Sequence, residues 1–318
     1  MSLPRLLVVA HGSRDPRHAA TVHALVGRVR ALRPGVRVET GFLDFNAPSV
    51  PQVLERLAAD EPGARGAAVE VVALPLLLTR AFHAKSDIPA VLAEASARLP
   101  RLRVRQAEVL GPVVSCPVEQ GAAPGGVGSK AEEGVMAEPS RPTTTPEAAV
   151  PGTATPRDNS PQALGPSPLL LAALERRLTE AGAAPSAAVR RSTGVVLASA
   201  GSTDPEAIAA IAETARELRR TGWCSVRPAF ASASLPRTED AVRALRADGC
   251  ARVAVAPYVI APGRLPDRIA AGAREADVLA DVLGPSPELA RLLVERYEQA
   301  VAAARGERAA PARIEVSA

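Results

Sequence analysis

The chain of 318 residues contains the same pattern twice. The segment LLVVAHGSRDP (6–16) corresponds to VVLASAGSTDP (195–205), and the segment 42–48 corresponds to 230–236. In each copy an apolar run is followed by turn-forming residues. Because two copies of one pattern must form the same supersecondary unit, the repeat sets the architecture before any motif is considered. The sequence therefore predicts two similar domains.

The first copy carries a long insertion. EVLGP (108–112) matches DVLGP (281–285), but the helical segment that follows in the second copy matches one that starts only at 167, so the offset falls from 173 to 119 residues, a difference of 54. The extra segment, about 113–162, is rich in Pro, Gly, Ser, Thr and Ala and lacks an apolar period, which predicts a disordered insertion. Its GGVGSK run (125–130) is no phosphate loop, since the Lys does not follow the last Gly directly and no buried strand precedes it.

Short β-branched runs alternate with helical patterns in each copy. The predicted strands of the first copy are Leu6–Ala10, Val36–Leu43, Ala67–Leu78 and Arg103–Leu110, and its predicted helices lie near 17–33, 48–59, 87–98 and 167–181. This alternation predicts an α/β fold in which each domain is a parallel sheet flanked by helices and joined by right-handed crossovers. We expect domains at 1–182 and 192–304, followed by a polar tail at 305–318.

Composition excludes several classes of protein. The three cysteines, Cys116, Cys224 and Cys250, form no CxxC pair, so neither a disulfide framework nor a structural zinc site is indicated. The first apolar run stops at His11, lacks a small-residue cleavage site and falls far short of a membrane span, which predicts a cytoplasmic protein without a membrane partner. The net charge of +4 is dispersed and aromatic residues make up 2%, so no nucleic-acid surface is expected.

Potential metal ligands follow three predicted strands of the first copy. His11 follows the first strand, Asp44 the second, and His83 lies a few residues beyond the third. In parallel α/β folds the carboxyl ends of the strands meet at the ligand-binding edge of the sheet. Two imidazoles and a carboxylate suit divalent cobalt, iron, nickel or zinc. Taken singly, a histidine after a strand is more often a packing or capping residue, but the three together predict one metal site.

The second copy serves as an internal control. The three ligand types are replaced there by Ala200, Ser232 and Leu265, so they are lost together. The turn-forming and helix-capping residues are kept: Gly201, Ser202, Asp204, Pro205, Pro236 and Pro257. A purely structural role would not explain this selective loss. The sequence therefore predicts one active site in the first half, with the second half as its wall or lid.

Cationic side chains near these positions are candidates for substrate binding. The basic residues are almost all arginine, which favours bidentate contacts with carboxylates if the substrate is a polyacid, although base composition of the gene would produce the same bias. Arg14, replaced by Thr203 in the second half, and Arg80 and Lys85, which flank His83, are the candidates. A solvated surface role is the alternative for each.

Three further polar residues complete the sequence-based expectations. Asp87, followed by Ile-Pro, is typical of a helix start, and its carboxylate could also orient His83. His18 and His23 fall on the predicted helix after the first loop, and we expect both on its surface and outside the site.

The first half resembles the class II chelatases of the CbiX and SirB type. The similar pieces are HGSR (11–14), GFLDFNAPS (41–49) and LPLLLTRAFHAKSDIP (74–89), which together span most of this half. The long form of that family likewise has two fused, similar halves with one functional site. The resemblance thus implies two chelatase-like domains, the second of them degenerate.

The resemblance also implies residue roles. His11 and His83 would be the metal-binding and catalytic histidines, and Asp44, the third metal ligand, stands where the family usually has Glu, whose side chain is longer. The family's usual Gly two residues before the second histidine is Ala81 here.

The implied activity is that of a lyase, a sirohydrochlorin cobaltochelatase or ferrochelatase of cobalamin or sirohaem biosynthesis. The divalent metal, cobalt or iron, is a substrate, and no organic cofactor is expected. The alternatives are a non-catalytic metal or tetrapyrrole carrier and, less favoured because Ala10 rather than Arg precedes His11, a phosphohistidine phosphatase. The tetrapyrrole is the expected partner, and since fused halves can form a pseudo-symmetric cleft within one chain, either a monomer or a homodimer is compatible.

Overall fold

The computed structural model describes residues 3–59, 68–112 and 165–309. The predicted insertion at 113–162 lies outside the described residues, as does the tail beyond 309. Both halves belong to one compact unit. Among the described helices, none is long and apolar enough to cross a membrane.

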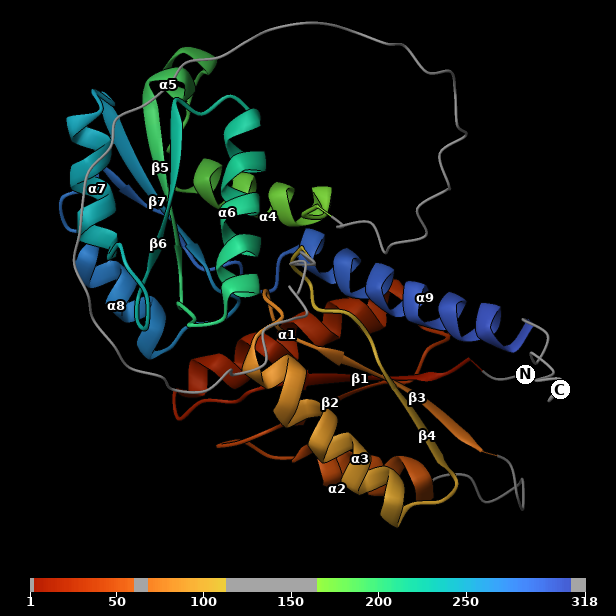
Figure 1. Cartoon of the computed structure of the whole chain (residues 1–318). Helices are drawn as coiled ribbons and strands as arrows, with labels where there is room; N and C mark the ends of the chain where they lie inside the picture. The colour runs from red at the N-terminus through yellow and green to blue at the C-terminus, as the bar shows by residue number, and fades with distance from the viewer. Residues whose placement is uncertain (1–2, 60–67, 113–164, 310–318) are drawn as a thin grey trace, which may run out of the picture. The chain divides into compact units, whose positions relative to one another are not determined.

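The first half is a four-stranded parallel sheet with strand order β2-β1-β3-β4 (Figure 1). Its strands are β1 (Arg5–Ala10), β2 (Val38–Phe42), β3 (Val69–Pro75) and β4 (Leu102–Gln106). Its helices are α1 (Pro16–Leu32), α2 (Val50–Ala59), the π-helix η1 (His83–Asp87) and α3 (Ile88–Arg98). Every predicted element of this half is present, with boundaries that differ by a few residues.

The second half repeats the arrangement with strand order β6-β5-β7-β8, again parallel. Its strands are β5 (Thr193–Ser199), β6 (Ser225–Phe230), β7 (Arg252–Tyr258) and β8 (Val278–Leu279). The remaining helices are α4 (Pro168–Glu180), α5 (Ala187–Ser192), α6 (Pro205–Arg220), α7 (Thr238–Ala247), α8 (Arg264–Gly272) and α9 (Pro287–Ala309). Two matching parallel sheets flanked by helices confirm the predicted fold class.

The loop after the first strand of each half has the same conformation. Gly12 and Gly201 both adopt φ of 96°, a region that favours glycine. A Cβ atom on Gly12 would lie 1.9 Å from the backbone oxygen of Asp44, and one on Gly201 would lie 1.8 Å from that of Ser232. The next helix is then capped by an aspartate, Asp15 for α1, whose carboxylate accepts from the backbone N–H of the second helical residue. The retained Gly and Asp residues thus place the residue after β1 and after β5 equivalently.

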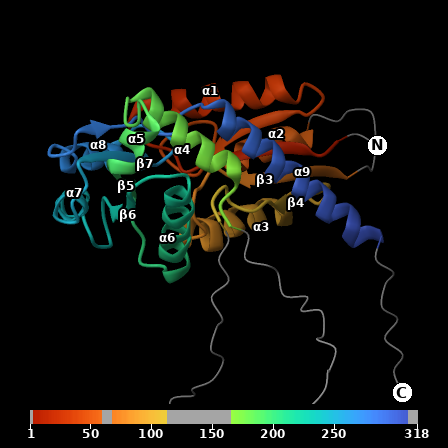
Figure 2. The same ribbon diagram turned by 90° about the horizontal axis from the view of Figure 1, so that it is seen from above.

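The last helix of each sequence repeat packs on the other half. Helix α4 contacts β7 and α6 of the second half, whereas α9, at the end of the chain, contacts α1 and β3 of the first (Figures 1 and 2). Helices α4 and α9 also pack against each other. One hydrophobic core accordingly takes in residues of both sheets, while a smaller core lies on the outer face of each. The predicted domain boundary near 182 therefore matches the end of the sequence repeat. In the structure, however, α4, which lies before this boundary, packs on the second half.

Candidate functional site

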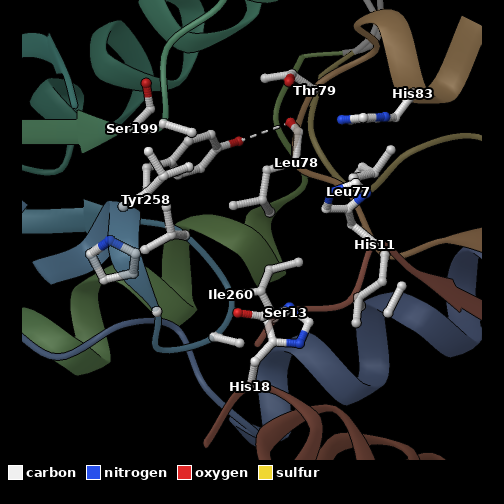
Figure 3. A pocket seen from close by; sticks show the side chains of 18 of the residues that line it. His11, Ser13, His18, Leu77, Leu78, Thr79, His83, Ser199, Tyr258 and Ile260 are labelled. Atoms are coloured by element: carbon white, nitrogen blue, oxygen red, sulfur yellow. Dashed lines mark hydrogen bonds between the residues drawn. The ribbon is translucent and has the colours of Figure 1, made fainter. Parts of the chain in front are cut away.

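A cavity of about 500 Å³ lies where the carboxyl ends of strands from both halves meet. The first half contributes the loop after β1, one face of α1 and the segment after β3, and the second half contributes the ends of β5, β6 and β7 and the start of α8. The side chains lining it include His11, Ser13, His18, Leu77, Leu78, His83, Tyr258, Ile260 and Leu265 (Figure 3). This is the sheet edge at which the parallel α/β pattern predicts a ligand, and the second half forms one wall.

Two of the three predicted ligands lie together in this cavity. The rings of His11, which follows β1, and His83, the first residue of η1, have centroids 4.5 Å apart and planes inclined by 34° (Figure 3). Burial lowers the pKa of His11, and the nearby His83 lowers it further. His11 Nδ1 is buried without a hydrogen-bond partner. A neutral imidazole with an unpartnered ring nitrogen is the form that binds a metal ion or accepts a proton.

Asp87 holds the second imidazole of the pair. His83 Nδ1 and Asp87 Oδ2 are 2.5 Å apart, so the ring nitrogen donates to the carboxylate one turn further along. This confirms the predicted contact between the two side chains. A proton kept on Nδ1 leaves the lone pair on Nε2, which fixes both the tautomer and the orientation of the ring.

The structure does not bring Asp44 into a three-ligand group. Its carboxylate accepts a hydrogen bond of 2.8 Å from the backbone N–H of Phe45, and it does not line the cavity, although its charge raises the pKa of His11. Within residues 3–59, 68–112 and 165–309, no group of three or more His, Cys, Asp or Glu side chains is close enough to hold a metal ion. Asp44 as a ligand therefore stays a prediction.

The three predicted cations do not line this cavity. The Arg14 guanidinium lies 5.3 Å from the ring centroid of Phe45. Lys85 Nζ forms ion pairs with Asp204 Oδ2 at 2.7 Å and Glu206 Oε2 at 2.9 Å, which join the two halves. Arg80 lines a separate hollow near α3 and β4. Their proposed contacts with a substrate remain untested.

A third histidine of the cavity escaped the sequence-based reasoning. His18 lines the cavity, its Nδ1 is buried without a partner, and burial, followed by the charge of His11, lowers its pKa. The expected surface position is correct for His23, which is exposed, but wrong for His18. Helix periodicity could have predicted this position, because His18 stands four residues before Val22, on the buried face of α1.

Similarity to known proteins identifies the family of the chain. The sequence model of the CbiX family matches residues 5–115 and 194–300, which is more than half of the chain. The chain belongs to the CbiX family. Both halves are matched, so the second copy is a unit of the same family although it lacks the two histidines.

Curated CbiX-type relatives match in part. A sirohydrochlorin cobaltochelatase of Methanococcus maripaludis is 31% identical over 87 residues, which is 27% of this chain and 56% of that protein. A sirohydrochlorin ferrochelatase of Priestia megaterium is 34% identical over 106 residues, which is 33% of this chain and 38% of that protein. The chain thus spans about half, or less, of the length of these relatives.

Solved structures share the fold over nearly the whole chain. SirB from Bacillus subtilis with Fe3+ superposes with a TM-score of 0.67 at 19% identity, covering 96% of this chain and 98% of that one. CbiX described as the terminal enzyme for biosynthesis of siroheme in denitrifying bacteria superposes with a TM-score of 0.54 at 18% identity, covering 93% and 99%. The two-sheet arrangement is therefore the fold of these solved structures.

Proposed function

We propose that this protein inserts a divalent metal ion, cobalt or iron, into a sirohydrochlorin-type tetrapyrrole. The observation that carries the proposal is the pair of imidazoles, His11 and His83, facing a cavity that both halves line. Membership of the CbiX family and relatives named sirohydrochlorin cobaltochelatase and ferrochelatase support the same substrate class.

The proposed chemistry follows from the state of the two rings. Metal insertion replaces two pyrrole N–H protons by the metal ion, so the site needs a ligand that releases the ion and a base that takes up protons. Neutral imidazole performs both roles near neutral pH. His83, oriented by Asp87, presents Nε2 to the metal ion, and His11, whose pKa is lowered by burial, stays unprotonated beside it. The metal is a substrate in this scheme and leaves with the product.

The cavity, of about 500 Å³, suits a sizeable and partly apolar ligand. Leu77 and Leu78 of the first half and Tyr258 and Ile260 of the second half supply apolar surface to the cavity (Figure 3). Tyr258 is buried, and its hydroxyl donates to the carbonyl of Leu78 across the two halves at 3.4 Å. This hydrogen bond links the first-half and second-half walls of the cavity.

Anaerobic metal insertion into sirohydrochlorin, followed by absorbance with cobalt, iron and nickel in parallel, tests the proposal. His11→Ala and His83→Ala should each lower turnover by at least about 100-fold, the range for loss of a general base or ligand. His23→Ala, which removes an exposed histidine of the same half, should leave turnover unchanged.

Two outcomes would oppose the proposal. Wild-type turnover no faster than the metal-only reaction would favour a non-catalytic carrier, which keeps the histidines without catalysis. Equal turnover in wild type and both alanine variants would remove the histidine pair from the mechanism.

A further inference from the structure

Among the described residues that line the cavity, one is permanently charged, and it comes from the second half. Arg264, the first residue of α8, is exposed and lines the cavity, and no Asp or Glu is among the lining residues that the structure describes. In the described part of the chain no carboxylate pairs with Arg264. A cation without a partner at a cavity free of acids is arranged for an anionic ligand.

The repeat shows that Arg264 is equivalent to Phe82, the residue that precedes His83 in the first half. Pro75 near the end of β3 corresponds to Pro257 near the end of β7, so Phe82 and His83 correspond to Arg264 and Leu265. Both His83 and Leu265 line the cavity, from opposite halves. Where the first half presents a metal-binding imidazole next to an exposed phenylalanine, the second half presents an apolar side chain next to a guanidinium.

Two other cations near the cavity are already engaged within the protein, and Arg80 lines a separate hollow. Lys85 is paired with Asp204 and Glu206, and the Arg14 guanidinium lies over the ring of Phe45. Reusing Lys85 for a substrate would break two ion pairs between the halves. Arg264 has no such cost, because it has no hydrogen-bond or ion-pair partner among the residues that the structure describes.

We propose that Arg264 binds a carboxylate of the tetrapyrrole substrate and so gives the second half a substrate-anchoring role. This inference rests on the proposed function. The macrocycle would lie against the apolar side chains of Ile260 and Leu265, with the metal-inserting pair on the opposite wall and one acidic substituent reaching Arg264 at the exposed margin. Guanidinium is suited to this contact, since it forms paired, charge-assisted hydrogen bonds with a carboxylate.

Binding of metal-free sirohydrochlorin, titrated by absorbance, is the direct test. Arg264→Ala should raise the Kd about 10-fold, and Arg264→Lys, which keeps the charge but loses the paired geometry, should fall between Arg264→Ala and wild type. Arg268→Ala, on the same helix and exposed but absent from the cavity lining, is the matched control and should leave the Kd unchanged.

The fully esterified tetrapyrrole separates the charge contact from packing. If Arg264 binds a carboxylate, wild type and Arg264→Ala should bind the ester with equal Kd, because the ester has no carboxylate charge for the guanidinium to contact. The rate of metal insertion at saturating sirohydrochlorin should change by less than about threefold in Arg264→Ala, since the arginine acts in binding rather than in the chemical step.

Opposite results would overturn the inference. These are an unchanged Kd in Arg264→Ala, an equal loss in Arg268→Ala, or an equal loss with the ester. Wild type that binds sirohydrochlorin without inserting metal would contradict the proposed function while leaving the Arg264 comparison valid. Metal insertion with an unchanged Kd in Arg264→Ala would contradict this inference alone.

Discussion

His83 lies close enough to His11 to add to the lowering of its pKa by burial. With ring centroids 4.5 Å apart, two imidazolium charges would repel each other, and burial of His11 opposes its protonation as well. The lowered pKa keeps His11 in the neutral form near neutral pH, and this is the form of imidazole that binds a metal ion. Asp87 adds orientation to this by holding one ring nitrogen of His83.

The first residue-scale prediction concerns that carboxylate. Asp87→Ala should lower metal insertion and cobalt affinity by about 10- to 100-fold, the usual effect of losing the partner that orients a metal-binding histidine. Glu94→Ala, an exposed carboxylate on the neighbouring helix α3, is the control. Isothermal titration with cobalt and the insertion assay measure both effects, and an affinity unchanged in Asp87→Ala would show that the ring needs no such support.

The second residue-scale prediction concerns the effect of pH on stability through the two histidines that line the cavity, His11 and His18. Burial lowers the pKa of His11 and of His18 in the folded protein, whereas both return to about 6.5 in the unfolded chain. Between the folded pKa and 6.5 the unfolded state binds more protons, so the free energy of unfolding is highest above about pH 6.5 and falls as the pH drops through the folded pKa values. Urea unfolding at about pH 7.5 and about pH 5.5 should therefore show a smaller loss for His18→Gln than for wild type.

The exposed His23 provides the comparison for this experiment. His23→Gln should lose as much stability on acidification as wild type. An equal loss in His18→Gln would mean that burial of His18 does not contribute to the pH dependence.

At the scale of elements, the strand-to-helix loops position the chemistry. The turn at Gly12 brings the backbone against the carbonyl of Asp44, and the same turn recurs at Gly201 against Ser232. The first loop carries His11 and the second carries Ala200, so the conformation of the loop does not depend on the histidine side chain. The turn is a feature of the fold in both halves, whereas the imidazole is present only in the first.

Glycine substitutions distinguish these turns from ordinary helix positions. Gly12→Ala and Gly201→Ala should each destabilise the protein by at least about 2 kcal/mol, because φ of 96° is strained for alanine and its Cβ would overlap a backbone oxygen. Gly27→Ala, within α1 and with no atom within 4 Å of the added Cβ, should stabilise by about 0.5–1 kcal/mol. Urea denaturation measures all three, and a neutral Gly12→Ala would refute the steric argument.

At the scale of the whole molecule, the two halves share one core. Helix α4 packs on the second sheet and α9 on the first, and Trp223 donates its Nε1 hydrogen to Glu175 of α4 at 2.7 Å. Arg296 of α9 is buried and donates to the carbonyl of Val109 in the first half at 3.0 Å. Losing either half would therefore expose apolar surface of the other.

This arrangement predicts a single cooperative unfolding transition. Leu54→Ala, in the outer core of the first half, should cost about 2–5 kcal/mol. Trp223 fluorescence, which reports on the second half, should shift its urea midpoint as far as far-UV circular dichroism does. A Trp223 midpoint that stays at the wild-type value would show that the halves unfold independently.

Local sequence carried much of the site as well as the fold. The repeat, the alternation of strands and helices and the loss of the ligand types from one copy led to two parallel sheets and to the His11–His83 pair, because strand ends in parallel sheets converge by construction. Asp87 could be paired with His83 because the two are only four residues apart. His18 was misplaced although its spacing to Val22 carried the signal.

The remaining features depend on contacts between segments that are distant in the chain. The position of Arg264 at the cavity, the pairing of Lys85 with Asp204 and the packing of α4 and α9 on opposite halves all arise across the two repeats. Local patterns determine which residues form a strand, a turn or a cap, since those depend on near neighbours and on backbone sterics. Which charges find partners, and which stay free to meet a ligand, is decided only when the two sheets close on a shared core, because that step sets the distances between their side chains.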